Sequence, residues 1–251
     1  MIRILLNGCN GKMGKMISKT ATDFKELEIT AGIDKYTEKS FNYNVYENIE
    51  KVDVDFDVIL DFSRPTALDS LIDYAKRNKK PLVLCTTGYS KEQIEKINES
   101  SKDCAIFRSA NMSIGVNVLN NLLRKISAFL YEDFDIEIIE KHHNQKVDAP
   151  SGTALLLGDT IRESIKEDTE YKFGRNGSSK REKKEIGVHA VRAGSIVGEH
   201  EVIFAGNGEI IELKHTALSR EVFAVGALKA CNFMRGKAKG LYSMDDVLKE
   251  K

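Results

Sequence analysis

The sequence predicts an α/β fold, with a doubly wound parallel-sheet domain and a second α+β domain whose sheet is mixed and mostly antiparallel. Three observations lead to this prediction. Short apolar runs alternate with amphipathic helical segments over the first third of the chain. A glycine-rich turn at residues 8–14 follows the first of these runs. Beyond residue 185, strand-like segments are separated by glycine turns.

The strands and helices of the first domain follow from local patterns. Buried parallel strands are expected at the short apolar runs over residues 2–6, 27–33, 58–62, 81–85 and 104–107. Between them, residues 12–24 and 67–76 have helical spacing, and Ser90 with Gln93 indicates a capping box that opens another helix. Polar side chains collect after the strands, where doubly wound sheets bind ligands.

The glycine turn suits the pyrophosphate of a dinucleotide. Gly8 permits a tight turn, Gly11 leaves room for the phosphates, and Gly14 lets the helix pack closely on the strand. The helix N-terminus adds free N–H groups and partial positive charge. Asp34 follows about twenty residues later, at the end of the second strand, where a carboxylate can bind the adenosine ribose. An ordinary strand-to-helix turn is the alternative, but this context favours a Rossmann-type site.

Asp34 and Lys35 bear on the choice between NADH and NADPH. The carboxylate favours the free 2′-hydroxyl of NADH, whereas the adjacent ammonium can pair with the 2′-phosphate of NADPH. Because the two side chains act in opposite directions, we expect the protein to use both cofactors.

The composition is that of an ordinary globular protein. The chain has 251 residues, of which 41% are hydrophobic and 30% charged, and its formal net charge is zero. This balance argues against a dedicated surface for nucleic acid or anionic membranes. The cysteines show no CxxC spacing and are expected to be buried, reduced thiols. With no membrane-length apolar stretch and no visible signal peptide, we expect a cytoplasmic protein.

The second half has a different pattern of elements. We expect helices over residues 116–130, 153–165 and 222–234, and strands over residues 134–140, 186–191, 199–205 and 209–215. The polar, basic segment 166–185 is predicted to be a solvated, mobile loop. Two domains are therefore expected, one formed by residues 1–113 together with 221–251 and the other by residues 114–220.

Residues 140–154 form the most informative segment, and their polarity predicts a loop that leads into a helix. An imidazole can move a proton at working pH, so His142 and His143 are candidates for acid–base roles. Lys146 can hold an anion or protonate a developing carbanion. The turn at residues 151–153 can present N–H groups and a hydroxyl to a carboxylate. Together these groups predict a pocket for an anionic substrate with acid–base capacity.

Two other interpretations of this segment remain open. Adjacent histidines without HExxH or similar spacing rarely hold one metal ion, so we predict no metal site. Ordinary capping and loop hydrogen bonds would account for part of the segment, including Asp148, whose carboxylate would then only order the turn.

Residues 142–154, with the sequence HHNQKVDAPSGTA, resemble the signature of the 4-hydroxy-tetrahydrodipicolinate reductase (dihydrodipicolinate reductase) family of diaminopimelate and lysine synthesis. The similarity covers nearly the whole chain, since it continues at residues 8–14, 61–65, 86–88, 109–113, 191–194, 197–200 and 219–220.

The resemblance implies that the first domain binds NADH or NADPH and that the second binds substrate and forms a homotetramer. The reaction would be hydride transfer from C4 of the nicotinamide to the cyclic dicarboxylate made by dihydrodipicolinate synthase. By the same resemblance, His142 is the proton donor and acceptor and Lys146 the proton donor. His143 would bind substrate, with Gly152 and Thr153 on a carboxylate.

The resemblance also implies a set of cofactor contacts at the ends of successive strands. They are Gly8, Cys9, Asn10, Gly11, Lys12, Met13, Asp34, Lys35, Cys85, Thr86, Thr87, Ser109, Ala110, Asn111 and Met112. Cys85 stands where many members have glycine, and Met112 where an aromatic residue is common. Because both would contact through backbone, we expect altered cofactor affinity rather than lost activity.

Two alternative functions are kept. Another NAD(P)H-dependent imine or semialdehyde reductase would share the glycine turn but would not need the His-His-x-x-Lys loop. A non-catalytic dinucleotide-sensing module would keep the fold alone.

Overall fold

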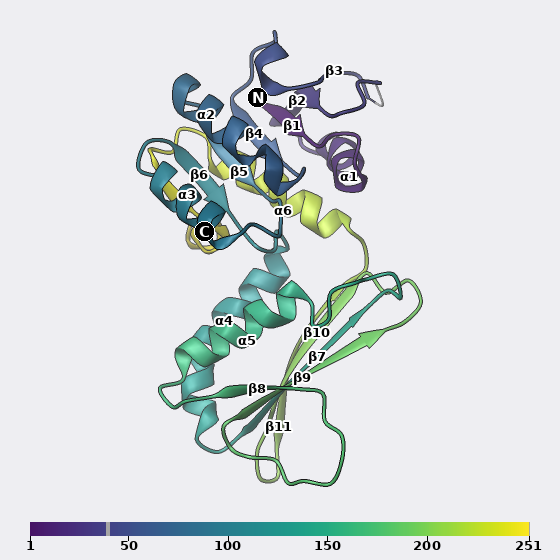
Figure 1. The fold of residues 1–251 in the computed structure, drawn as a ribbon, viewed down its shortest axis with the longest axis vertical. Coiled ribbons are helices and arrows are strands. Elements are labelled where there is room, and N and C mark those ends of the chain that lie inside the picture. The colour runs from purple at the N-terminus through teal and green to yellow at the C-terminus, as the bar shows by residue number, and fades with distance from the viewer. Residues whose placement is uncertain (39–40, 251) are drawn as a thin grey trace. The chain divides into compact units, whose positions relative to one another are not determined.

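The computed structural model describes residues 1–38 and 41–250, which form two compact units (Figure 1). The first unit comprises Met1–Ile114 and Arg220–Lys251, and the second comprises Gly115–Ser219. Within the described residues, no helix is long and apolar enough to cross a membrane.

The first unit is built on a seven-stranded sheet in the order β12-β6-β5-β4-β1-β2-β3, in which every pairing is parallel. Its strands are β1 (Ile2–Asn7), β2 (Leu27–Ile33), β3 (Asn44–Tyr46), β4 (Val58–Asp61), β5 (Leu82–Leu84), β6 (Ala105–Arg108) and β12 (Gly240–Tyr242). The predicted Rossmann-type sheet is thus confirmed. Because β2 and β4 flank β1 on opposite sides, the loops after β1 and β4 leave the sheet at a topological switch point.

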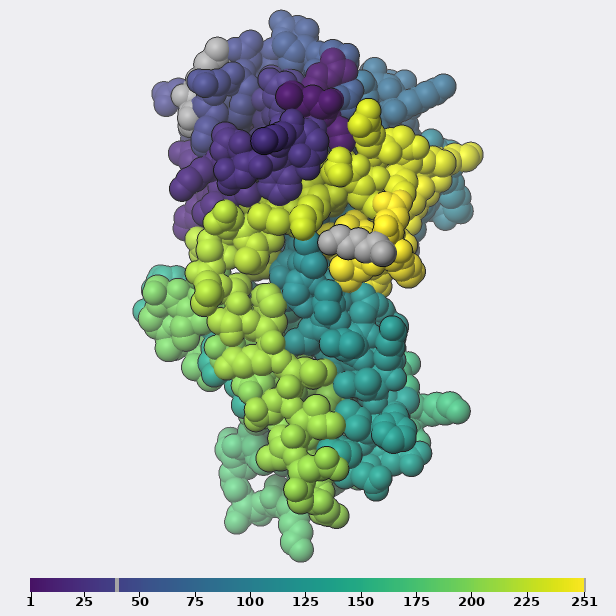
Figure 2. Space-filling model, turned by 180° about the vertical axis from the view of Figure 1, so that it is seen from behind, coloured from purple at the N-terminus to yellow at the C-terminus, as the bar shows by residue number. Residues whose placement is uncertain are grey.

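Helices cover both faces of this sheet. They are α1 (Lys12–Ala21), α2 (Leu68–Asn78), α3 (Lys91–Ser100), α6 (Glu221–Phe233) and α7 (Met244–Lys249), with 3-10 turns at Ile49–Lys51 and Pro65–Ala67. Successive strand residues point to opposite faces, so Leu6 joins the cluster under α1 and α6, whereas Leu5 joins the one under α2 and α3. From the C-terminal part of the chain, α6 contacts α1 and β1 (Figure 2).

Three elements of the first unit lie outside the sequence-based predictions. β3 and β12 are edge strands of three residues each, too short to show a two-residue alternation. α7 is a six-residue helix, and its signal is local: Ser243 and Asp246 form a capping box. The capping box predicted at Ser90 and Gln93 is confirmed at the start of α3.

The second unit packs two helices on a five-stranded sheet in the order β11-β10-β7-β9-β8. The helices are α4 (Ile114–Tyr131) and α5 (Gly152–Ser164), and the strands are β7 (Asp135–His142), β8 (Glu170–Phe173), β9 (Glu185–Arg192), β10 (Gly198–Ala205) and β11 (Ile210–Ala217). The sheet is mixed, as predicted. β10 pairs antiparallel with β7 and β11, while β9 pairs parallel with β7 and β8.

The prediction of a mobile loop over residues 166–185 is wrong in part, because β8 lies within it and extends the sheet along β9. Arginines of this segment are also anchored: Arg175 pairs with Glu185 at 2.7 Å, and Arg181 with Asp135 at 2.8 Å. Charges that suggested a solvated loop therefore make ion pairs with residues of β7 and β9.

A second prediction is corrected at residues 141 and 142, since the strand predicted to end at residue 140 continues as β7 to His142. β7 lies between β10 and β9, so the backbone at this polar end still finds ladder partners on both sides. The alternation along β7 also buries every second residue through to His142.

Candidate active site

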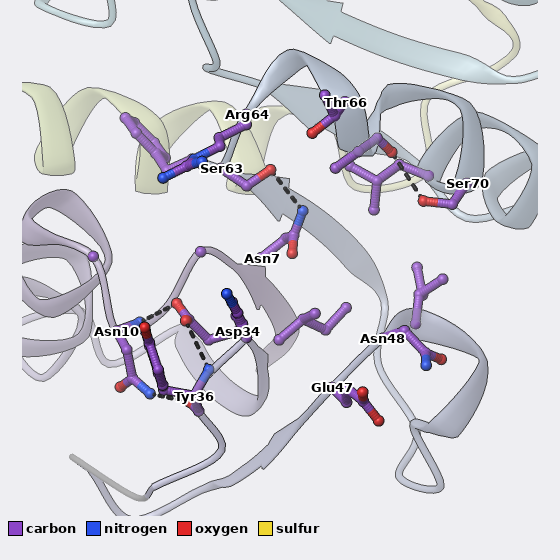
Figure 3. A pocket seen from close by; sticks show the side chains of 18 residues that line it. Asn7, Asn10, Asp34, Tyr36, Glu47, Asn48, Ser63, Arg64, Thr66 and Ser70 are labelled. Carbon is purple, nitrogen blue, oxygen red and sulfur yellow. Dashed lines mark hydrogen bonds between the residues drawn. The ribbon is translucent and has the colours of Figure 1, made fainter.

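A pocket of about 860 Å³ opens at the switch point of the parallel sheet (Figure 3). Segments after β1, β2 and β4, together with the residues near 48, form its walls. The lining residues are Asn7, Gly8, Asn10, Gly11, Ile33, Asp34, Lys35, Tyr36, Glu47, Asn48, Ile49, Phe62, Ser63, Arg64, Thr66, Ala67, Ser70 and Leu71. This volume and the polar walls suit a nucleotide-sized ligand.

Asp34 ties the end of β2 to the glycine turn. Its carboxylate accepts the backbone N–H of Asn10 at 3.0 Å and that of Tyr36 at 3.3 Å. The amide Nδ2 of Asn10 in turn donates to the carbonyl of Tyr36 at 2.7 Å. The carboxylate at the predicted ribose position is therefore fixed in place before any ligand binds.

The glycine turn fits a diphosphate. Gly8 has a φ of +81°, and a Cβ there would lie 2.6 Å from the carbonyl oxygen of Phe62, while a Cβ on Gly14 would lie 2.2 Å from that of Gly8. At Gly11 an added Cβ would meet only the Gly8 oxygen, at 3.2 Å, and would otherwise enter the pocket. Because Gly11 is also the N-cap, no side chain caps α1, and its first N–H groups remain available to phosphate.

A buried carboxylate joins three strand ends beside this pocket. Asp61 is fully buried, and its oxygens accept from Asn7 Nδ2 at 2.7 Å, Ser63 Oγ at 2.5 Å and Thr86 Oγ1 at 2.7 Å. Burial raises the pKa of Asp61, although these hydrogen bonds act in the opposite direction. Asp61 therefore links the ends of β1, β4 and β5. The loops after β1 and β4 line the pocket.

The structure brings five of the residues implied as cofactor contacts to this pocket: Gly8, Asn10, Gly11, Asp34 and Lys35. The other implied contacts do not line it. Cys9 is buried beneath the turn, Lys12 and Met13 lie in α1, and the segments 85–87 and 109–112 follow β5 and β6 farther along the sheet.

Cys85 and Met112, the two departures from the family pattern, have buried side chains in the core under α6. All four cysteines are free and buried, as predicted. Because both side chains point into the core, only backbone atoms at these positions can face a ligand at the sheet edge.

The sequence reasoning missed several pocket residues, notably Ser63, Arg64 and Thr66, which face Asp34 across the pocket (Figure 3). Their signal was present: Ser63, Arg64 and Thr66 follow within five residues of the end of the buried strand β4. Arg64 supplies a cation to a pocket wall that otherwise has neutral polar groups on that side.

In the second unit, the end of β7 carries a buried polar cluster. Nδ1 of His142 lies 2.6 Å from Oε2 of Glu140, which is fully buried. Arg192 from β9 donates to both oxygens of Glu140, at 2.8 and 2.7 Å. His200 from β10 bonds Ser151 Oγ at 2.9 Å, and its ring meets that of His142 edge-on at 5.1 Å between centroids.

These contacts set the protonation of the cluster. Burial lowers the pKa of His142, although Glu140 acts to raise it, and burial lowers that of His200 to about 4. For Glu140, burial acts to raise the pKa, but hydrogen bonds from Arg192 and His142 outweigh it and leave the pKa below its ordinary value. At neutral pH, neutral imidazoles therefore surround an ionised Glu140.

The loop after β7 places the other predicted site residues. His143 is half-buried, and its carbonyl accepts the backbone N–H of Lys146 at 3.1 Å. The Lys146 ammonium pairs with Asp148 at 2.8 Å. In the described residues, no group of three or more histidine, cysteine or acidic side chains is arranged to hold a metal ion.

The start of α5 is open in front of its first turn. Ser151 is the N-cap and accepts the N–H of Ala154 at 3.1 Å. A Cβ on Gly152 would meet nothing within 4 Å, and Thr153 follows in the same turn. Since helix N-termini attract anions, this turn can receive a carboxylate.

Comparison with known proteins agrees with both units. Residues 2–112 match the family model described as dihydrodipicolinate reductase, N-terminus, and residues 115–248 match the one for the C-terminus. A protein of Clostridium novyi (strain NT) named 4-hydroxy-tetrahydrodipicolinate reductase is 68% identical over 100% of both chains. Its namesake in Clostridium tetani (strain Massachusetts / E88) is 62% identical over 99% of this chain and 97% of the other.

A solved structure resembles the whole chain as well. Dipicolinate-bound dihydrodipicolinate reductase from Paenisporosarcina sp. TG-14 is 25% identical, with a TM-score of 0.81 over 97% of each chain. With the matched families covering both units and the relatives matching end to end, this chain belongs to the dihydrodipicolinate reductase family.

Proposed function

We propose that this protein catalyses the NAD(P)H-dependent reduction of 4-hydroxy-tetrahydrodipicolinate to tetrahydrodipicolinate, in diaminopimelate and lysine biosynthesis. The observation that carries the proposal is the conjunction, within residues 142–153, of a buried imidazole, a lysine ammonium and an open helix N-terminus. The identity of 68% to a full-length relative of that name supports the same reaction.

The first unit would hold the cofactor. Gly8 and Gly11 with the start of α1 would bind the pyrophosphate, and Asp34 and Lys35 would face the adenosine ribose. When bound, NADH or NADPH supplies a hydride from C4 of its nicotinamide.

The second unit would bind the dicarboxylate. Gly152 and Thr153, in the first turn of α5, would donate to one carboxylate, and His143 would contact the substrate from the preceding loop. The Lys146 ammonium adds positive charge to the same loop. These N–H donors and this cation would together bind an anionic substrate.

Proton transfer would fall to Lys146 and His142. Substrate and product differ by loss of a hydroxyl and gain of hydrogen, so a proton must accompany the hydride and water must leave. The Lys146 ammonium would be the proton donor. His142, whose pKa burial lowers, is a neutral imidazole that can accept a proton and pass it on.

The decisive experiment is a coupled assay with dihydrodipicolinate synthase. We expect NADH or NADPH to be oxidised only when the product of the synthase is supplied. Equal or faster oxidation with other imines or semialdehydes would instead favour a different reductase. Cofactor binding by calorimetry without oxidation of any imine would favour a sensing module.

The proposal extends to assembly and location. On the family resemblance, we propose a homotetramer formed through the second unit, acting in the cytoplasm. The equal numbers of basic and acidic residues, 38 of each, support a small-molecule partner rather than nucleic acid. Light scattering of the purified protein tests the tetramer.

A further inference from the structure

We propose that Glu140 is a positioning residue that holds His142 as its Nδ1–H tautomer and fixes the start of α5 through the same carboxylate. The inference rests on the proposed function and deepens it, because it specifies which nitrogen of His142 exchanges the proton. Glu140 would not touch the substrate; it would act through His142 and Ser151.

The strand register produces this arrangement. Ile136 and Ile138 face the core of the second unit, and the two-residue period of β7 places Glu140 and His142 on the same buried face. Arg192 lies opposite His142 in the parallel pairing with β9. On the other side, His200 of β10 lies opposite Glu140.

The contacts of Glu140 determine the tautomer. Arg192 and the backbone N–H of Ser151, which is 2.9 Å from Oε1, can only donate. A carboxylate that accepts these bonds while fully buried is ionised and has no proton to give. At the 2.6 Å contact, Nδ1 of His142 must therefore be the donor, which leaves Nε2 to exchange a proton.

The Nε2 side of the His142 ring is also constrained. A Cβ on Gly198 would lie 3.1 Å from Nε2 of His142, so the glycine makes room for the imidazole. The charged or titratable groups around the ring are Glu140 on its own strand, Arg192 on β9, Lys146 in the following loop and His200 on β10. Of these, Glu140 is the one anion.

The polar pair is not required for packing. Ile136 and Ile138 show that the buried face of β7 accepts aliphatic side chains, yet at position 140 the chain buries a carboxylate and pairs it with the partly exposed Arg192. Buried ion pairs are weak contributors to stability compared with apolar residues of similar size. A positional role therefore explains Glu140 better than a stabilising one.

The substitution Glu140→Gln tests this directly. The glutamine oxygen at the Oε1 position would still accept from Arg192 Nη2 and Ser151. Its NH₂ group at the Oε2 position would lose the bond from Arg192 Nη1, face Nδ1 of His142 and force the Nε2–H tautomer. We expect kcat to fall at least about tenfold, as for lost outer-shell partners of functional histidines, with the KM for NADH unchanged. Glu140→Asp keeps the charge and should recover part of kcat.

The matched control is Glu137→Gln. Glu137 lies on the same strand but the other face, and it too contacts a histidine, His189, at 2.7 Å, and an arginine, Arg181. This control should retain wild-type kcat. Nitrogen-15 NMR of labelled histidines, assigned with His142→Gln, should show the Nδ1–H tautomer in the wild type and a lower pKa of His142 in Glu140→Gln.

An Nε2–H tautomer in the wild type, or wild-type kcat in Glu140→Gln, would overturn the inference. So would a Glu140→Asp variant no more active than Glu140→Gln. A wild-type protein without reductase activity would instead refute the proposed function, and the NMR measurement would still report on the Glu140 contact.

Discussion

The ammonium of Lys146 lies 2.8 Å from Oδ1 of Asp148, so the proposed proton donor is held by a carboxylate two residues farther on. Burial acts to raise the pKa of Asp148, but the hydrogen bond and charge of Lys146 outweigh it and leave the pKa lowered. The Asp148 side chain is 59% exposed, and such pairs are weak. A substrate carboxylate can therefore take its place beside Lys146 at little cost.

Replacing Lys146 by alanine should lower kcat by at least about a hundredfold, the usual scale for a lost general acid. Cofactor binding should change little, because the dinucleotide pocket lies in the first unit. Steady-state kinetics and calorimetry with NADH measure the two effects. Lys184→Ala, which removes an exposed lysine paired with Glu170, is the control and should be fully active. Near wild-type turnover in Lys146→Ala would remove Lys146 from the chemistry.

Two glycines of the same turn should respond differently to alanine. In Gly11→Ala the new methyl group enters the pocket, so we expect the KM for NADH to rise at least about tenfold, or 1.4 kcal/mol, with little change in Tm. In Gly14→Ala the methyl group would lie 2.2 Å from the Gly8 carbonyl oxygen, so the turn itself must shift and Tm should fall. Equal effects of both changes on KM and Tm would contradict these separate roles.

The use of both cofactors should depend on Lys35. Lys35 lines the pocket beside Asp34, whose oxygens accept backbone N–H groups, and its ammonium can pair with the 2′-phosphate. Lys35→Ala should lower kcat/KM for NADPH about tenfold, or 1.4 kcal/mol, and leave that for NADH nearly constant. In the wild type, a preference for one cofactor above about a thousandfold, some 4 kcal/mol, would exclude dual use.

The stability of the second unit should fall as the pH drops from about 6.5 to about 4. Burial lowers the pKa of His200 to about 4, so over this range the unfolded chain binds a proton that the folded chain excludes. The contribution of His200 is present in full above pH 6.5, and up to roughly 3 kcal/mol is lost at the acid end.

Urea unfolding at several pH values measures this dependence. His200→Gln should flatten the slope between pH 6.5 and pH 4. An unchanged slope in His200→Gln would assign the acid sensitivity to other groups.

Local pattern was enough to predict five of the seven strands in the sheet of the first unit. The run over residues 27–33 is β2 with the predicted bounds, because a mostly apolar segment lies there between the charged residues Glu26 and Asp34. The glycine turn and Asp34 were likewise identified from spacing alone. In the second unit, the family resemblance implied roles for His142 and Lys146 that remain proposals.

Long-range contacts account for what local pattern did not predict. Glu140 looks like an ordinary polar residue in sequence, and its partner Arg192 lies 52 residues away, so nothing nearby indicates burial. Ser63 and Arg64 come to face Asp34 only through the order of β1, β2 and β4 in the sheet. The strand β8 was not predicted because its alternation of charged and aromatic residues lies within a longer charged segment, whose side chains pair with distant residues.

The return of residues 220–251 to the first unit has a consequence for how the chain is made. α6 packs on α1, and β12 adds to β6, so the nucleotide-binding unit lacks α6 and an edge strand until these residues leave the ribosome. The second unit, contiguous over Gly115–Ser219, is synthesised before that point. We therefore expect the first unit, whose synthesis begins first, to complete its folding last, after α6 has been synthesised.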